Sequence, residues 1–338
     1  MKRVARILLA LILVLVGLAA AAITCTIGWR PFIGPKARSL TGRTFDRTPQ
    51  RLERGRYIAT ALAGCIDCHS PHDWNAPGTP YVPGMEGAGE IMPEPNLPGR
   101  IVAPNLTPDP ETGAGRWTDD QLARAIREGI GHDGRALFPM MPYTHYQEMS
   151  DEDLASVVVY FRSLTPVRKQ LPRTEIIFPV KYLIRGVPQL LNSPVPEPPS
   201  TLEPAKRGAF LVNMAGCSDC HTPQDKGQEI PGLSFAGGSP FPGPWGNVSS
   251  ANITPDPSGI PYYDEGLFLQ VMHTGSVKAR HLNDVMPIMV YKNLSDEDLK
   301  SMFAFLRTLK PVQHRVDNSE PPTLCRLCRQ KHGSGNRN

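Results

Sequence analysis

Residues 65–69 read Cys-Ile-Asp-Cys-His, and residues 217–221 read Cys-Ser-Asp-Cys-His. Each stretch follows Ala-Gly and is followed by a hydroxyl residue and a proline. Further features recur around both stretches in the same order, so the 338-residue chain contains two copies of one domain. These features are Arg54-Gly55 and Arg207-Gly208, Asn-Leu/Ile-Thr-Pro-Asp-Pro at 105–110 and 252–257, Met141-Pro142 and Met286-Pro287, and Ser-Asp-Glu-Asp-Leu at 150–154 and 295–299.

The repeated Cys-x-x-Cys-His pattern is typical of the covalent attachment of c-type haem. Two thiols at this spacing reach the two vinyl groups on one porphyrin edge, and the next residue places an imidazole under the iron. The alternative is a disulfide or redox pair with an incidental histidine, but a redox Cys-x-x-Cys would sit in a βαβ setting, which the sequence lacks. We therefore expect two haem c groups. The predicted attachment cysteines and proximal ligands are Cys65, Cys68 and His69 for the first haem, and Cys217, Cys220 and His221 for the second.

The sixth iron ligand should come from far along each copy. Met141 and Met286 stand at matching positions, each followed by proline and then by a capped helix, so we predict that these thioethers bind iron. Met140 and Met289 are local competitors, but neither has a methionine at the matching position of the other copy. Bis-histidine ligation is a further alternative. Its candidates, which also lack a matching histidine in the other copy, are His72, His132, His145, His273 and His281.

Three side chains are candidate partners of the haem propionates. Arg135 and Arg280 each stand six residues before the predicted methionine ligand, where a guanidinium could neutralise a propionate. Trp117 could donate its indole N–H in the same way. An exposed arginine is the simpler explanation of either arginine position.

Local signals in each copy indicate helices joined by loops, in keeping with 36 prolines. Thr118 and Gln121 form a capping box before an apolar helix that Gly129 should end. Ser150 and Ser295, each followed by three acidic residues, should begin the last helix of the two copies.

A glycine in the first helix of each copy predicts a close crossing with the last helix. Gly55 and Gly208 would meet Tyr160 and Phe305, which occupy matching positions. The expected fold is all-α, with two tandem domains and an N-terminal transmembrane helix. The expected divisions are an anchor or signal sequence at 1–30, a first domain at 48–168, a Pro-rich linker at 169–203, a second domain at 204–314 and a basic tail at 315–338. Within the linker, the apolar but Pro-broken stretch 176–191 is too short to be a second span, and we expect it to pack between the domains.

The N-terminus carries a candidate membrane span. Lys2, Arg3 and Arg6 precede an uncharged, mostly apolar run over residues 7–28, about as long as the roughly 20 residues that a bilayer needs. This length favours an uncleaved anchor over a cleaved signal peptide, although the alanines at 19–22 would suit cleavage. Basic residues on both sides leave the orientation open. A net charge of only +4 gives no reason to expect nucleic-acid binding.

Together, the motifs resemble class I cytochrome c domains over roughly residues 50–312. More narrowly, the chain is similar to the cytochrome c subunits of bacterial membrane-bound alcohol, gluconate and sorbitol dehydrogenases. That resemblance implies electron transfer from a dehydrogenase or another membrane or periplasmic donor towards a quinol-oxidising complex or terminal oxidase. It also implies haem domains on the periplasmic side of the cytoplasmic membrane, where bacteria attach c-type haem. Those relatives commonly carry three haem domains, whereas this chain shows two.

The predicted function is therefore one-electron transfer by a carrier without a catalytic residue of its own. The alternative is a dihaem peroxidase-like enzyme, which needs one iron with a vacant or labile distal position.

The tail contains a third Cys-x-x-Cys, at Cys325 and Cys328, but Arg329 takes the place of the adjacent histidine. A third haem would lack its proximal ligand there. A zinc site would need Cys325, Cys328, His332 and His314, the last of which is distant in sequence. The interpretation that the sequence favours is a disulfide or a spare thiol pair, which suits an oxidising compartment.

Overall fold

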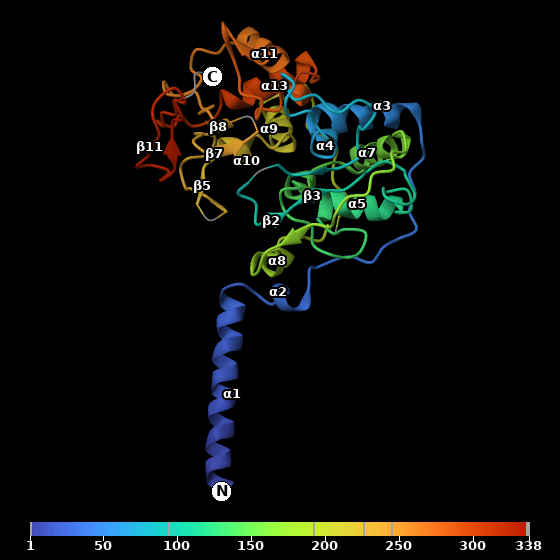
Figure 1. The fold of residues 1–338 in the computed structure, drawn as a ribbon, viewed down its shortest axis with the longest axis vertical. Helices are drawn as coiled ribbons and strands as arrows, with labels where there is room; N and C mark the ends of the chain where they lie inside the picture. The colour runs from blue at the N-terminus through green and yellow to red at the C-terminus, as the bar shows by residue number, and fades with distance from the viewer. Residues whose placement is uncertain (1, 94, 192, 226, 245, 336–338) are drawn as a thin grey trace.

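The computed structural model describes residues 2–335 apart from residues 94, 192, 226 and 245. Helix α1 (Lys2–Cys25) extends away from a body in which the two repeats lie side by side (Figure 1). Within the described residues, α1 is the single helix that is long and apolar enough to cross a membrane, and none of its residues is buried. The short helix α2 (Arg30–Ile33) follows it at the edge of the body.

Helices form the core of both repeats. Those of the first repeat are α3 (Pro49–Tyr57), the π-helical turn η1 (Ile58–Leu62), α4 (Cys65–Cys68), α5 (Asp119–Glu128), α6 (Tyr143–Tyr146) and α7 (Asp151–Ser163). Those of the second are α9 (Pro204–Met214), α10 (Cys217–His221), α11 (Glu265–Thr274), α12 (Ile288–Tyr291) and α13 (Asp296–Leu306). Between them lie α8 (Val180–Leu183) and the 3-10 turn η2 (Ile184–Gly186).

The predicted caps are confirmed. The Thr118 hydroxyl accepts a hydrogen bond from the Gln121 N–H, and the Gln121 side chain accepts one from the Thr118 N–H. Gly129 ends α5 in a left-handed conformation, with φ at 70°. Ser150 and Ser295 cap α7 and α13 by accepting hydrogen bonds from the N–H groups three residues on.

The predicted glycine crossings are also confirmed. A Cβ on Gly55 would collide with the backbone carbonyl of Ser156 in α7 and lie 3.0 Å from the Tyr160 Cβ. Gly208 meets Ser301 and Phe305 of α13 in the same way. Only glycine therefore allows the first and last helices of each repeat to approach this closely.

The two repeats share one hydrophobic core and pack on each other reciprocally. Helix α6 of the first repeat contacts α9 of the second, while α12, the counterpart of α6, contacts η1, which continues α3. Hydrogen bonds reinforce this interface. The Tyr57 hydroxyl donates to Asp298 at 2.6 Å, and the His145 ring lies 2.7 Å from the Asn213 side-chain oxygen and 2.8 Å from the Asp219 carboxylate.

Short strands accompany the helices, which the all-α expectation did not include. In the described residues they form two-stranded antiparallel ladders, in the pairs β1–β3, β2–β4, β5–β6, β7–β8, β9–β10 and β11–β12. The first six strands are β1 (Glu90–Ile91), β2 (Gly99–Arg100), β3 (Val102–Ala103), β4 (Glu175–Ile176), β5 (Gln224–Asp225) and β6 (Gln228–Glu229). The others are β7 (Pro240–Gly243), β8 (Gly246–Ser249), β9 (Ser276–Val277), β10 (Arg280–His281), β11 (Thr323–Leu324) and β12 (Lys331–His332).

The start of the segment expected to be a linker packs against the first repeat. Strand β4 pairs with β2, and the Lys169 ammonium donates to the Gly89 carbonyl at 2.6 Å. The following α8 and η2 pack on α2, where Arg185 donates to the Pro31 carbonyl at 3.0 Å. The packing partner of this apolar stretch is therefore α2, which differs from the expected position between the domains.

Residues 38–45 also belong to the first repeat. The guanidinium groups of Arg38 and Arg43 lie 2.6 Å and 2.7 Å from the fully buried Asp120 carboxylate. Arg38 also reaches Glu128 at 2.7 Å. These ion pairs fix the connection between α2 and the first domain.

Candidate functional site

The first Cys-x-x-Cys-His stretch forms the one-turn helix α4, which begins after Gly64 in a left-handed conformation, with φ at 59°. Cys65 and His69 are buried. The His69 Nδ1 lies 2.7 Å from the Pro104 carbonyl oxygen. Because a carbonyl can only accept, Nδ1 carries the proton and Nε2 presents a lone pair. Burial lowers the pKa of His69 to about 4, which keeps this imidazole neutral.

The repeated Asn-Leu/Ile-Thr-Pro-Asp-Pro motif holds that carbonyl in place. The buried Asn105 accepts hydrogen bonds from the Thr107 N–H at 2.9 Å and hydroxyl at 2.7 Å. Its amide donates to the Val167 carbonyl at 2.8 Å. Asn105 therefore locks the loop next to Pro104 and so fixes the orientation of His69.

The second repeat reproduces this arrangement. The His221 Nδ1 lies 2.7 Å from the Ala251 carbonyl, directly before Asn252. Asn252 accepts from the Thr254 N–H and hydroxyl and donates to the Val312 carbonyl. Burial lowers the pKa of His221 as well, although part of this residue stays exposed to solvent.

A cavity of about 930 Å³ opens beside α4. Its lining includes Cys65, Cys68, His69 and the predicted ligand Met141, which packs against the core. The competing Met140 also lines it. The structure therefore brings both cysteines, the histidine and the methionine of the first repeat to one space.

A second cavity, of about 1440 Å³, lies between the repeats. Its lining includes Cys220, Met286, Arg280 and the competitor Met289. Among the described residues that line it, His221 does not appear. The second repeat thus brings one cysteine and the methionine to this cavity.

The alternative histidine ligands already have polar or aromatic partners. In the first cavity, His132 stacks on Trp117 at 4.2 Å. His145 bridges the repeats, and its hydrogen bond with Asp219 raises its pKa. The others line the second cavity, and their partners are Trp74 for His72, Asp296 and the Lys292 carbonyl for His273, and Ser276 for His281.

The predicted propionate partners lie on the cavity walls. Arg135 and Trp117 line the first cavity, and Arg135 lies 3.5 Å from the Asp133 carboxylate. Arg280 lines the second cavity from β10. Their role towards a propionate stays a prediction.

The motif analysis missed two tyrosines that contribute to the site. The Tyr146 hydroxyl donates to the Ala63 carbonyl at 2.6 Å, and Tyr291 donates to Ala215 at 2.7 Å. Each bond holds the backbone two residues before the first cysteine of its motif. Each tyrosine follows the predicted methionine by five residues, and this second repeat match could have revealed them.

The two cavities share part of their walls. Residues that line both are Asp67, Cys68, Met92, Met140, Cys220 and Pro287. The attachment motifs of the two repeats therefore border one another. The tail residues Cys325 and Cys328 do not appear in the described lining of either cavity.

The donor groups fit covalently attached haem, since thiols from one helical turn and an imidazole with a free Nε2 face the same cavity. Sequence comparison agrees: the cytochrome c family model matches residues 52–165 and 205–310, more than half of the chain. The chain belongs to the cytochrome c family. It carries two covalently attached haem c groups.

Several relatives are subunits of larger complexes. The chain is 33% identical to a subunit of the nicotinate dehydrogenase of Pseudomonas putida, over 66% of this chain and 18% of that protein. It is 26% identical to the cytochrome c subunit of alcohol dehydrogenase (quinone) of Gluconobacter oxydans, over 86% of this chain and 61% of that protein. A diheme cytochrome c-type of Cereibacter sphaeroides is 28% identical over 77% of this chain and 86% of that protein. The chain thus spans less than two thirds of the first two of these relatives.

Proposed function

We propose that this chain is a membrane-anchored, extracytoplasmic dihaem cytochrome c that relays single electrons from a dehydrogenase partner to a respiratory acceptor. Relatives named as cytochrome subunits of alcohol, fructose and gluconate dehydrogenases support the choice of donor. The acceptor would be a quinol-oxidising complex or a terminal oxidase. Haem iron supplies one-electron redox chemistry, while the protein supplies its axial ligands, its orientation and its exclusion from water.

In the proposed ligand sets, His69 and Met141 bind the first iron, while His221 and Met286 bind the second. The free Nε2 of each histidine, fixed by a backbone carbonyl on Nδ1, supports the proximal assignment. Met141 lines the same cavity as His69, and Met286 occupies the matching position in the repeat. Cys65 with Cys68, and Cys217 with Cys220, would form the thioether bonds.

The proposed electron relay between the two haems rests on the wall that the two cavities share. Cys68 and Cys220, one from each attachment motif, border both cavities. Groups attached there would lie next to each other across a largely buried interface. The reciprocal packing of α6 on α9 and of α12 on η1 would keep their separation fixed.

Photochemical injection of one electron into the oxidised protein tests the relay. We expect rapid reduction followed by a redistribution phase whose rate is independent of protein concentration. The matched single-haem variants, Cys65→Ala with Cys68→Ala and Cys217→Ala with Cys220→Ala, should lack that phase. Its absence from the wild type would contradict the relay. Carbon monoxide binding to one ferrous haem, with peroxide turnover, would favour the peroxidase-like enzyme instead.

The membrane anchor rests on the exposure of α1. Its 24 residues exceed the roughly 20 needed to span the hydrocarbon core, and none is buried by the protein. Aromatic side chains follow it, as is typical of a membrane interface: Trp29 and Phe32 are exposed, with ring centroids 6.2 Å apart. Further exposed apolar side chains, Ile33 of α2 and Phe178 beside α8, lie in the segments that pack together next to this helix. We infer that this end of the body rests against lipid.

Alkaline carbonate extraction of native membranes tests the anchor, because it removes peripheral proteins. The full chain should stay with the membrane, and a variant that begins at Gly28 should be released. Starting later, at Ser39, would also delete Arg38 and its ion pairs with the buried Asp120. Release of the full-length, uncleaved chain would contradict the anchor, and a mature N-terminus after Ala22 would identify a cleaved signal.

A further inference from the structure

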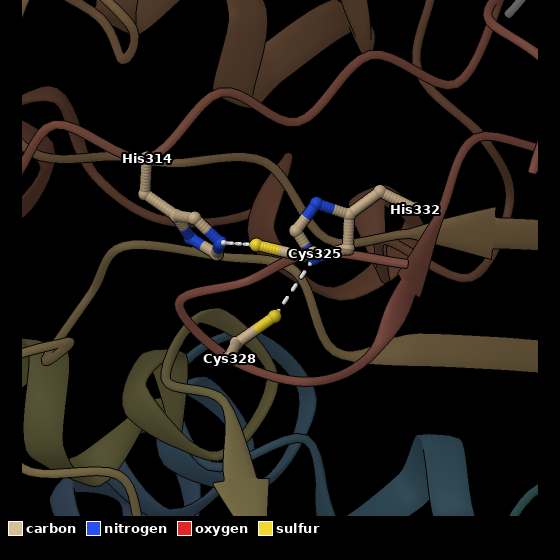
Figure 2. A group of neighbouring side chains, drawn as sticks. All are labelled: His314, Cys325, Cys328 and His332. Atoms are coloured by element: carbon tan, nitrogen blue, oxygen red, sulfur yellow. Dashed lines mark hydrogen bonds between the residues drawn. The ribbon is translucent and has the colours of Figure 1, made fainter. Parts of the chain in front are cut away.

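Four side chains of the C-terminal segment converge away from both cavities. His314, Cys325, Cys328 and His332 direct their ligand atoms at one point, and these atoms all lie within 4.8 Å of one another (Figure 2). The His314 Nε2 lies 3.3 Å from the Cys325 Sγ, and the His332 Nε2 lies 3.0 Å from the Cys328 Sγ. We call this group the Cys2His2 cluster. All its members except Cys325 are buried.

Backbone contacts orient both histidines of the cluster. The His314 Nδ1 lies 2.9 Å from the Ala236 carbonyl, so Nδ1 carries the proton and Nε2 offers its lone pair to the cluster. The backbone of Arg315 lies beside the His332 ring. A carbonyl partner on the outer nitrogen, as His314 has, is typical of metal-binding histidines.

The two cysteines lie in a tight turn between β11 and β12. The Cys325 N–H donates to the Gln330 carbonyl at 2.9 Å, and the Arg329 N–H donates to the Cys325 carbonyl at 3.0 Å. The Leu327 N–H points at the Cys325 Sγ at 3.4 Å. These hydrogen bonds hold the turn from which both sulfurs point into the cluster.

The donor set selects among metals and excludes a third haem. Two thiolates and two imidazoles at tetrahedral spacing are typical of zinc, which binds sulfur at about 2.3 Å and nitrogen at about 2.0–2.1 Å. Ligands at those lengths lie roughly 3–4 Å apart around one ion, as the two contacts above do. Arg329 follows Cys328 directly, so a third haem would lack an adjacent proximal ligand.

Comparison of the repeats shows that the cluster is an addition to the second domain. Gly237 and Gly89 match, because each donates its N–H to the carbonyl of the motif histidine. The next residue is Gly238 in the second repeat and Glu90 in the first. A Cβ on Gly238 would lie 2.6 Å from the His332 Nε2 and 2.7 Å from the His314 Cε1.

The residue in place of His314 also differs between the repeats. Both Lys169 and His314 donate their backbone N–H to a hydroxyl of the neighbouring loop, at Thr112 and Ser258 respectively. The Lys169 ammonium donates a hydrogen bond to the Gly89 carbonyl. The His314 ring bonds the Ala236 carbonyl through Nδ1, and its other nitrogen faces the cluster. The second repeat therefore combines a glycine that makes room with a histidine that can bind metal.

We propose that the Cys2His2 cluster binds one structural zinc ion, with release of the two thiol protons. The ion would fasten the C-terminal segment to the loop over residues 233–238. That loop supports the second attachment motif, because the Gly237 N–H donates to the His221 carbonyl at 2.7 Å. Asn318 of the same tail bonds the backbone of Ser249 in β8. The zinc site thus joins the tail to the elements around the proximal histidine of the second domain.

Metal analysis of untagged, full-length, haem-loaded protein tests the proposal. We expect one zinc and two irons per chain. Cys328→Ser and His314→Gln should each lower zinc at least tenfold and leave iron unchanged. The matched controls Cys25→Ser and His281→Gln, outside the cluster, should keep zinc. A wild-type protein without zinc, whose Cys325 and Cys328 form a disulfide, would overturn the proposal, as would a third iron.

Trypsin supplies a second measurement that does not depend on how well the variants fold. Arg326, Arg329 and Lys331 are cleavage sites within the β11–β12 segment. A zinc chelator added to the wild type should speed cleavage there at least tenfold, because cleavage follows the population of the opened state. Added zinc should restore protection. Equal cleavage with and without chelator, in protein shown to have lost its zinc, would refute the fastening role.

Discussion

Replacement of Asn105 by alanine should weaken the first domain and alter its haem. The side chain makes four hydrogen bonds, at 2.9 Å and 2.7 Å with Thr107, at 2.8 Å with the Val167 carbonyl and at 3.4 Å with the Thr112 hydroxyl. Thr107 is fully buried, so water cannot replace these bonds without opening the loop. Each buried polar group left unpaired costs about 1–3 kcal/mol.

Three groups lose Asn105 as a close partner, namely the Thr107 N–H, the Thr107 hydroxyl and the Val167 carbonyl. Their summed cost would be about 3–9 kcal/mol, and we expect a total near the lower end of this range. The Thr107 hydroxyl also lies 3.4 Å from the Val167 carbonyl, so these two groups can partly satisfy each other. We therefore expect Asn105→Ala to reduce the free energy of unfolding by about 3 kcal/mol. For a domain of this size, the melting temperature should fall on the order of 10 °C.

A potential change should accompany the loss of stability. Asn105 holds the loop whose Pro104 carbonyl accepts from the His69 Nδ1, and this bond makes the imidazole a stronger donor to iron. Loosening it should raise the reduction potential of the first haem and leave the second unchanged. Thermal melting followed by circular dichroism, together with a spectroelectrochemical titration, measures both effects.

Two substitutions serve as controls. Asn252→Ala removes the matching bonds with Thr254 and the Val312 carbonyl in the second repeat, together with bonds to Ser258 and the His314 carbonyl, so it should act on the second haem. Asn75→Ala alters an exposed side chain and should change neither quantity. The reasoning is refuted if Asn105→Ala melts like Asn75→Ala, or if both haem potentials move equally.

Three further substitutions address ligation, pH dependence and packing. Met141→Ala should lower the potential of the first haem and abolish its red sulfur-to-iron band, since a thioether stabilises ferrous iron; if Met140→Ala has these effects instead, the ligand is the neighbouring residue. The hydrogen bond with Asp219 raises the pKa of His145 above 6.5, so its stabilisation of the interface is fully present below pH 6.5 and is lost as pH rises through the raised pKa. His145→Gln should remove that pH dependence from urea denaturation, and an unchanged profile would assign it to another group. Gly208→Ala should cost about 1–3 kcal/mol or more through the clash with the α13 backbone, and a stability equal to wild type would show that the helices can separate without penalty.

Short-range signals in the sequence predicted much of the fold. The caps at Thr118, Ser150 and Ser295 fixed helix starts, because a capping side chain bonds to N–H groups two or three residues away. The internal repeat then predicted the crossings at Gly55 and Gly208, because two copies of one domain must solve the same packing problem. The attachment motifs were recognisable for the same reason, since their chemistry lies within five residues.

The interactions that the sequence did not predict join residues far apart along the chain. The Pro104 carbonyl on His69 and the Ala63 carbonyl under Tyr146 are backbone atoms, which carry no residue-specific signal. The pairing of β4 with β2 likewise joins two-residue strands too short to show alternation.

The sequence by itself determined that this protein has two haem-attachment domains and an apolar N-terminal helix, because each of those signals is local or repeated. Only the tertiary structure decided how the domains meet, with both attachment motifs bordering a shared wall. It also decided that His314 joins Cys325, Cys328 and His332, although His314 stands eleven positions before the nearest cysteine. Packing of the tail on the second domain closes that distance, and the sequence encodes that packing only through the sum of many weak contacts.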